Sequence, residues 1–118
     1  DPTRGGLASS LNEIAEIAKV GMLLDEEKIP ILDEVKGACE ILGLDPLYIA
    51  NEGKMIAIVS NEIADNVFKE WRKLGLGKEA EIIGEIISEN PGTVVMKTTI
   101  GSKRIVDMIT GEQLPRIC

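Results

Sequence analysis

Residues 5–24 read Gly-Gly-Leu-Ala-Ser-Ser-Leu-Asn-Glu-Ile-Ala-Glu-Ile-Ala-Lys-Val-Gly-Met-Leu-Leu: a glycine turn, an amphipathic stretch and a short apolar run. Apolar residues of the middle part recur at spacings of three and four, as on one face of a helix: Leu7, Leu11, Ile14 and Ala18. Gly21 is expected to end this helix, and the apolar run 22–24 predicts a strand. The stretch therefore predicts a helix followed at once by a strand, the first unit of a layered fold.

Two further helices are predicted downstream. The first begins near Pro30, has acidic residues at 33–34 in its first turn and ends before Gly43. The second is capped by Ser60 or Asn61. Its inner, apolar stripe is expected to consist of five residues: Ile63, Ala64, Val67, Trp71 and Leu74.

The remaining apolar segments are predicted as strands. They cover residues 54–59, 81–87, 93–99 and 104–109. The strand 54–59 follows a polar turn and is expected to be buried. Turns at 90–92 and 101–102 separate the last three strands. The order is helix, strand, helix, strand, helix and then three strands. Helices with one apolar stripe each, together with this number of strands, predict an α+β fold in which a mixed β-sheet is layered with α-helices.

The composition narrows the classes of partner. At 118 residues the chain is expected to form one domain with its own core, and 44% hydrophobic with 28% charged residues is an ordinary globular balance. A net charge of −7 repels nucleic acid and anionic lipid, and no apolar run has the length of a membrane span. Two cysteines and no N-glycosylation motif favour a reducing compartment, so the cytoplasm is expected. Small molecules and proteins remain as ligands.

Several familiar sites are excluded. The chain has no histidine, and its two cysteines are far apart in sequence, so neither a histidine-based triad nor a zinc site can be assembled, and no metal ligands are predicted. The stretch Gly75-Leu76-Gly77-Lys78-Glu79-Ala80 is similar to a dinucleotide-binding fingerprint. It follows a predicted helix and precedes a predicted strand, which is the reverse of the required order, so we interpret it as a helix end and turn.

The two cysteines lie in different settings. Cys39 shares an apolar helical stripe with Leu32, Val35 and Leu42 and is expected to be a buried hydrophobic residue. Cys118 follows a short tail, 111–118, that would span about 23–25 Å beyond Gly111 if extended. Such a thiol is either an accidental feature of a frayed end or a mobile carrier of a chemical group.

Two polar clusters have the chemistry of a binding site. Thr3-Arg4-Gly5-Gly6 combines backbone N–H groups, a helix N-terminus and a guanidinium, a set that suits phosphate. The alternative is a plain helix start after a tight turn. Asn51-Glu52-Gly53 presents an amide and a carboxylate at the entrance of a predicted strand, and the alternative there is a solvated turn.

Three stretches closely resemble one protein family. They are the opening Asp1-Pro2-Thr3-Arg4-Gly5-Gly6-Leu7 with residues 11–15, the stretch 41–54, and the terminal Leu114-Pro115-Arg116-Ile117-Cys118. The sequence resembles the HypE family of hydrogenase maturation proteins, which belongs to the aminoimidazole ribonucleotide synthetase (PurM-like) superfamily. The resemblance runs through the whole chain, and Pro-Arg-Ile-Cys is its most specific part.

The resemblance implies an activity and roles for residues. A carbamoyltransferase places a carbamoyl group on the thiol of Cys118, ATP phosphorylates the carbamoyl oxygen, and loss of phosphate leaves a thiocyanate that supplies cyanide to [NiFe]-hydrogenase. Glu52 is then a candidate base for the carbamoyl nitrogen, and Asn51 can hydrogen-bond the same group. Thr3, Arg4, Gly5 and Gly6 would lie near the phosphates.

The resemblance also implies what this chain lacks. The family's N-terminal half, which provides most of the ATP and Mg²⁺ site and the homodimer surface, is absent. The chain is therefore expected to be the C-terminal domain, PurM-like and distantly similar to the ferredoxin-like fold, with residues 1–110 as the domain and 111–118 as a flexible tail. Alone, it is expected to be inactive and to hold no tightly bound cofactor. The partners implied for the whole protein are the carbamoyltransferase HypF and the iron-carrying scaffold proteins HypC and HypD.

Two other functions remain open. In the first, the tail serves as a docking peptide without chemistry, and Leu114 and Ile117 would then matter more than the sulfur of Cys118. The domain would otherwise belong to a purine-biosynthetic or selenophosphate-type synthetase of the same superfamily. The terminal Pro-Arg-Ile-Cys argues against both synthetases.

Overall fold

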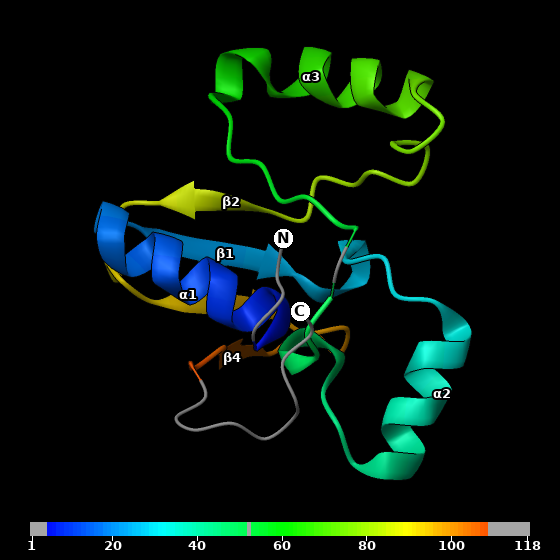
Figure 1. Cartoon of the computed structure of the whole chain (residues 1–118). Helices are drawn as coiled ribbons and strands as arrows, with labels where there is room; N and C mark the ends of the chain where they lie inside the picture. The colour runs from blue at the N-terminus through cyan, green and yellow to red at the C-terminus, as the bar shows by residue number, and fades with distance from the viewer. Residues whose placement is uncertain (1–4, 52, 109–118) are drawn as a thin grey trace.

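A computed structural model describes residues 5–51 and 53–108 (Figure 1). The helices are α1 (Gly6–Ala18), α2 (Asp33–Leu42) and α3 (Asn61–Lys73), with short 3-10 helices η1 (Glu26–Lys28) and η2 (Pro46–Tyr48). The strands are β1 (Gly21–Asp25), β2 (Gly84–Ile87), β3 (Val94–Lys97) and β4 (Lys103–Ile105). Within these ranges no helix is both long enough and apolar enough to cross a bilayer.

The four strands form one mixed sheet in the order β2-β1-β3-β4. β1 pairs antiparallel with β2 and parallel with β3, and β3 pairs antiparallel with β4. β1 and β3 are therefore central, although β1 comes from the first quarter of the chain and β3 from the last. The predicted α+β fold with a mixed sheet and helices is confirmed.

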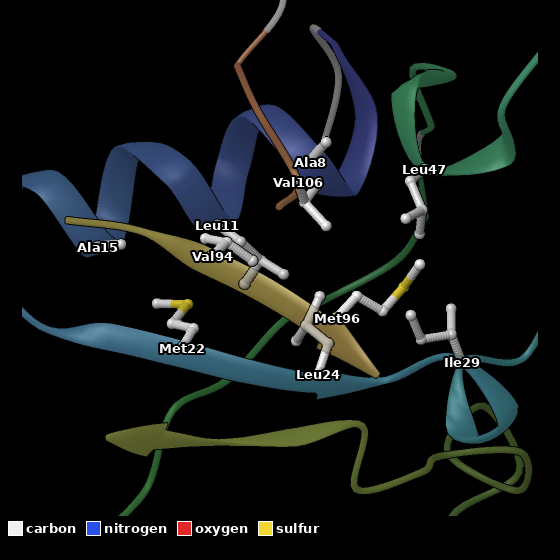
Figure 2. Packing of buried hydrophobic residues seen from close by; sticks show 10 residues of the cluster. All are labelled: Ala8, Leu11, Ala15, Met22, Leu24, Ile29, Leu47, Val94, Met96 and Val106. Carbon is white, nitrogen blue, oxygen red and sulfur yellow. The ribbon is translucent and has the colours of Figure 1, made fainter. Parts of the chain in front are cut away.

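The helix α1 lies across one face of this sheet and encloses the core (Figures 1 and 2). The core contains apolar side chains from α1, β1, β3 and the segment after β4, with one residue from η2 and one from the chain after η1. These residues are Ala8, Leu11, Ala15, Met22, Leu24, Val94, Met96, Val106, Leu47 and Ile29. Met22 and Leu24 alternate with a half-buried Leu23, as expected for a strand with one face on a helix. The opening stretch therefore builds one side of the core, but the predicted face was only partly correct. Leu11 is buried as expected, whereas Ile14 and Ala18 are exposed, and the small residues Ala8 and Ala15 face the sheet in their place.

The ends of the helices agree with the predictions in most places. Gly43 terminates α2 in the left-handed region, and the Ser60 side chain accepts a hydrogen bond from the backbone N–H of Glu62 at the start of α3. Two predictions were wrong. α1 ends at Lys19, which takes the left-handed conformation, and Gly21 is the first residue of β1. α2 begins after Leu32, so Pro30 lies outside it.

The predicted buried strand 54–59 is absent. These residues have no partner in the described sheet, and Met55, Ile58 and Val59 are 70%, 48% and 40% exposed. Ile56 packs against the core. A run of β-branched and apolar residues favours an extended chain, but a strand also needs a free sheet edge beside it, and that is a tertiary condition. The predicted strand 22–24 is present as the longer β1, and 81–87 and 93–99 are present in shortened form as β2 and β3. The predicted strand 104–109 corresponds to the shorter β4, which starts one residue earlier, and residue 109 lies outside the described residues.

Two predicted apolar stripes are only partly covered. Cys39 is buried at 4% exposure as expected, whereas Leu32, Val35 and Leu42 around it remain exposed. On α3, Ala64, Val67 and Trp71 face an apolar cavity of about 330 Å³ toward β2, whereas Ile63 and Leu74 are 49% and 60% exposed. The stripes mark the correct helical faces, but neither helix is pressed tightly onto the sheet.

Candidate functional site

Three segments that are distant in sequence converge at the N-terminal end of α1. They are the start of α1 at Gly5 and Gly6, the chain from η2 to Asn51, and residues 104–107 in and after β4. Figure 2 shows Ala8, Leu47 and Val106 close together at this end of the helix. The site is therefore built on the same core that holds the fold.

The start of α1 approaches η2 at the level of the backbone. Gly5 and Gly6 both have φ of 67°, a conformation that L side chains rarely adopt. A Cβ added to Gly6 would lie 2.5 Å from the carbonyl oxygen of Ile49 and 2.6 Å from that of Leu47, closer than any real contact. Among the described residues, which begin at Gly5, no side chain caps this helix end. The first-turn N–H groups lack acceptors within a helix by geometry, so this end can receive a phosphate oxygen.

The carboxylate of Asp45 stabilises η2 and links it to β4. One oxygen of Asp45 accepts a hydrogen bond from the backbone N–H of Leu47 at 3.0 Å, and the other accepts one from Arg104 Nη2 at 2.8 Å. The hydrogen bond to Asp45 is the main cause of a raised pKa of Arg104, which stays charged. One side chain thus caps a short helix and joins it to β4.

The ring of Tyr48 joins η2 to the chain that follows β4. Its hydroxyl donates a hydrogen bond to the carbonyl oxygen of Asp107 at 2.8 Å. Partial burial, and then the negative charge of Asp45, raise the pKa of Tyr48 above its ordinary value of 10.0. The phenol is therefore neutral near neutral pH and remains a donor.

Asn51 lies at the end of the same segment. Its side-chain amide donates to the carbonyl oxygen of Ile49 at 2.9 Å, the oxygen that also faces Gly6. The amide nitrogen is thus engaged by its own loop, and Asn51 Oδ1 is the atom suited to accept a hydrogen bond from a ligand N–H.

Only some of the predicted site residues fall in the described ranges. Gly5, Gly6 and Asn51 do, and the structure brings Gly6 and Asn51 together at Ile49, whereas Gly5 lies against Ser9. Thr3, Arg4, Glu52, Cys118 and the tail 111–118 lie outside the described residues. Sequence reasoning missed Asp45, Tyr48 and Arg104. The pair Asp45-Pro46 was a usable signal, because aspartate before proline often caps a turn.

The described residues offer no metal site. Between residues 5 and 108, leaving aside residue 52, no three Asp, Glu or Cys side chains are grouped so that they could hold a metal ion. The cavity under α3 is lined mainly by apolar side chains, and none of Gly5, Gly6 and Asn51 takes part in it. The polar site at the start of α1 is therefore the better candidate for chemistry.

Comparison with known proteins gives a consistent picture. The family described as AIR synthase related protein, C-terminal domain, matches residues 1–97. The carbamoyl dehydratase HypE of Cupriavidus necator is 55% identical, and that of Rhizobium leguminosarum bv. viciae 53% identical, over all 118 residues. In each case the chain spans 34% of the length of the relative.

Solved structures are similar over the same span. A crystal structure of the hydrogenase maturation protein HypE has a TM-score of 0.93 and 44% identity, covering 100% of this chain and 39% of that one. HypE in complex with ATP has a TM-score of 0.91 at 44% identity, covering 100% and 36%. A HypE-HypF complex has a TM-score of 0.86 at 42% identity, covering 92% and 35%.

Proposed function

The chain belongs to the family of the AIR synthase related protein, C-terminal domain, and we propose that it is this domain of an ATP-dependent carbamoyl dehydratase of the HypE type. The observation that carries the proposal is the 55% identity to a carbamoyl dehydratase over every residue of the chain. Because the chain spans about a third of such relatives, the activity is assigned to the longer parent protein.

The reaction converts a carbamoyl thioester into a thiocyanate. The sulfur of Cys118 carries the group S–C(=O)–NH₂, and the carbamoyl oxygen attacks the terminal phosphorus of ATP, which releases ADP. A base then removes a proton from the nitrogen while the carbon–oxygen bond breaks. The products are S–C≡N on Cys118, inorganic phosphate that keeps the carbamoyl oxygen, and the protons of the amide nitrogen. The cyanide so formed is proposed as the ligand supplied to [NiFe]-hydrogenase.

Residues of this chain have distinct parts in that scheme. Cys118 is proposed as the carrier on the arm 111–118, and Glu52 as the base, since the chain contains no histidine. Asn51 Oδ1 is suited to accept a hydrogen bond from the carbamoyl N–H, which would orient the group. Support for these roles comes from the placement of Asn51 beside Gly6 and from the anchoring of residues 104–107, which precede the tail in sequence.

The described residues fit one end of ATP. The start of α1, where Gly5 and Gly6 make no side-chain cap, suits phosphate oxygens, and Thr3 and Arg4 directly precede it in sequence. ATP supplies the phosphoryl group that turns a poor leaving group into a good one. Mg²⁺ does not fit the described residues, which contain no ligand cluster. Its ligands, and the rest of the nucleotide site, are proposed to come from the part of the parent that precedes this domain.

Partners and location follow from the same scheme. HypF is proposed as the carbamoyl donor to Cys118, supported by the HypE-HypF complex among similar structures. HypC and HypD are proposed as acceptors of the cyanide, and the parent is proposed to be a cytoplasmic homodimer. Neither a nucleic acid nor a membrane is proposed as a ligand.

The test follows the mass of the C-terminal peptide of the full-length parent. Incubation with HypF, its carbamoyl substrate and magnesium ATP should add a carbamoyl group to Cys118 and then remove one water. Glu52→Gln should accept the group and dehydrate it about 10²–10⁴-fold more slowly, whereas the exposed control Glu85→Gln should behave as wild type.

Other outcomes would redirect the proposal. A wild-type Cys118 that stays unmodified would overturn it. Cys118→Ser that still matures hydrogenase, together with loss of function in Leu114→Ala or Ile117→Ala, would identify the tail as a docking peptide. Normal dehydration by Glu52→Gln would move the base to the preceding part of the parent.

A further inference from the structure

Two side-chain contacts tie the start of the C-terminal segment to η2. Arg104 of β4 binds Asp45 at 2.8 Å, and Tyr48 binds the carbonyl of Asp107 at 2.8 Å. Each contact joins residues 59 positions apart in sequence. Both lie at the same end of the molecule, where they hold the chain just before residues 109–118.

The two contacts link η2 to β4 and to the chain that follows β4. Asp45 caps η2 through Leu47 N–H and binds Arg104 with its other oxygen, so a shift of β4 is transmitted to η2. Tyr48 is the last residue of η2, and Asn51 follows three positions later. The segment that carries Asn51 and the strand that leads to the tail are therefore held in a fixed relation.

The remaining chain is long compared with the site. Eleven residues, 108–118, follow Asp107 and span at most about 36–40 Å if extended. A tethered group searches a volume that is set by its tether and by where the tether is attached. A loose attachment enlarges that volume and lowers the effective concentration of the thiol at the site.

Resting on the proposed function, we infer that Tyr48 and Arg104 are positioning residues that fix the root of the C-terminal arm beside the segment carrying Asn51. In this proposal they act through the chain segments that they hold and not on the reacting atoms, and they change no bond in the reaction. Their effect is on how often the modified thiol of Cys118 reaches the site in a productive position.

This role predicts a selective kinetic effect. Loss of the Tyr48 hydroxyl, in Tyr48→Phe, or of the ion pair, in Arg104→Met, should slow the intramolecular dehydration of carbamoylated Cys118 by about 2–10-fold each, the size expected for one hydrogen bond. The rate of carbamoylation by HypF should keep its wild-type value, because HypF is a separate protein and the thiol need not reach the site on this domain. The affinity for ATP should also be unchanged. A general loss of folding would lower all three together.

The experiment uses the full-length parent in single-turnover mode. Protein carbamoylated on Cys118 is isolated, mixed with magnesium ATP, and sampled for the mass of the C-terminal peptide. Arg72→Met is the matched control, because Arg72 also bridges to a carboxylate, Glu81 at 3.6 Å, but does so from α3 and away from residues 104–107. It should dehydrate at the wild-type rate.

The outcomes separate this inference from the function on which it rests. Slower dehydration in Tyr48→Phe and Arg104→Met, with unchanged carbamoylation and ATP affinity, supports it. Dehydration at the wild-type rate in both variants overturns the inference and leaves the proposed dehydratase activity untouched. An equal fall in dehydration, carbamoylation and ATP affinity also overturns the inference, because it would mean that the two residues have only a structural role. If the wild-type parent fails to dehydrate its adduct, the proposed function fails and the inference falls with it.

Discussion

The side-chain amide of Asn12, in the middle of α1, donates a hydrogen bond to the carbonyl oxygen of Val106 at 2.8 Å, 94 residues along the chain. The same nitrogen donates to the carbonyl of Ala8 at 2.8 Å, and the side chain is only 9% exposed. This amide therefore satisfies a backbone carbonyl just after β4 and ties the first helix to the last described segment. Together with the Tyr48 contact, it holds residues 106 and 107 from two sides.

Replacement of Asn12 should destabilise the domain. Asn12→Ala leaves the Val106 carbonyl without its partner in a buried place, at a cost of about 1–3 kcal/mol. Asn66→Ala, on the exposed surface of α3, should change the free energy of unfolding by at most about 0.5 kcal/mol. Urea denaturation followed by circular dichroism measures both. Equal values for the two variants would show that the Asn12 contact contributes little.

Two glycines should respond to alanine in opposite directions. Gly6→Ala forces a methyl group onto backbone carbonyls at a φ of 67° and should lower the free energy of unfolding by more than about 2 kcal/mol. Gly37 lies inside α2 with nothing within 4 Å of an added Cβ, so Gly37→Ala should stabilise by about 0.5–1 kcal/mol. Thermal and urea unfolding check the signs. A neutral Gly6→Ala would contradict the close approach of α1 to η2.

Tyr48, the only tyrosine of the chain, should lose its phenolic proton at a higher pH than a free tyrosine. Burial and the charge of Asp45 raise the pKa of Tyr48 above 10.0 in the folded protein. The folded state thus holds the phenolic proton more tightly than the unfolded state. This contribution to stability is complete below about pH 10 and is lost as the pH rises through the folded pKa. Ultraviolet titration of the phenolate gives the pKa, and the alkaline loss of stability should be smaller in Tyr48→Phe. A midpoint at or below 10 would be the contrary result.

The two thiols should differ in reactivity. Cys39 is 4% exposed in the folded protein and should react with iodoacetamide only slowly, until urea unfolds the chain. Cys118 is expected to react first and fast. Peptide mapping after a brief pulse gives the ratio, with the urea-unfolded chain as the control for intrinsic reactivity. Equal labelling of both in the native protein would contradict the burial of Cys39 or the accessibility of Cys118.

The 118-residue chain alone should bind ATP weakly. The described residues contain a helix start whose N–H groups suit phosphate but no cluster of metal ligands, and binding of a nucleotide with Mg²⁺ depends on both. Isothermal titration with magnesium ATP should show no micromolar binding to this chain, in contrast to the full-length parent. A micromolar dissociation constant for the isolated chain would place the nucleotide site mostly within this domain.

Local signals in the sequence were sufficient for the helices and the fold class. Spacings of three and four identified α1 and α3, Gly43 marked the end of α2, and Ser60 marked the start of α3. These features act within one or two turns of the chain, so no knowledge of distant residues is needed to interpret them. The order of helices and strands then pointed to a mixed sheet covered by helices.

Segments whose state depends on distant partners could not be predicted in this way. Residues 54–59 have the composition of a buried strand but pair with none of the described strands, and most of them are exposed. The pairing of β1 with β3, which makes both central, joins residues about 70 positions apart and leaves no mark on local composition. Which strands pair depends on which strand edges lie side by side, and only the folded chain determines that.

The candidate site divides in the same way. The sequence alone determined which chemical groups are available: two adjacent glycines before a helix, an Asn-Glu loop, a terminal thiol and no histidine. Only the tertiary structure decided that Gly6, Ile49 and Asn51 share one place, and that Tyr48 and Arg104 hold the chain leading to the tail there. The physical reason is that hydrogen bonds and close backbone contacts act over about 3 Å in space, whatever the separation along the chain.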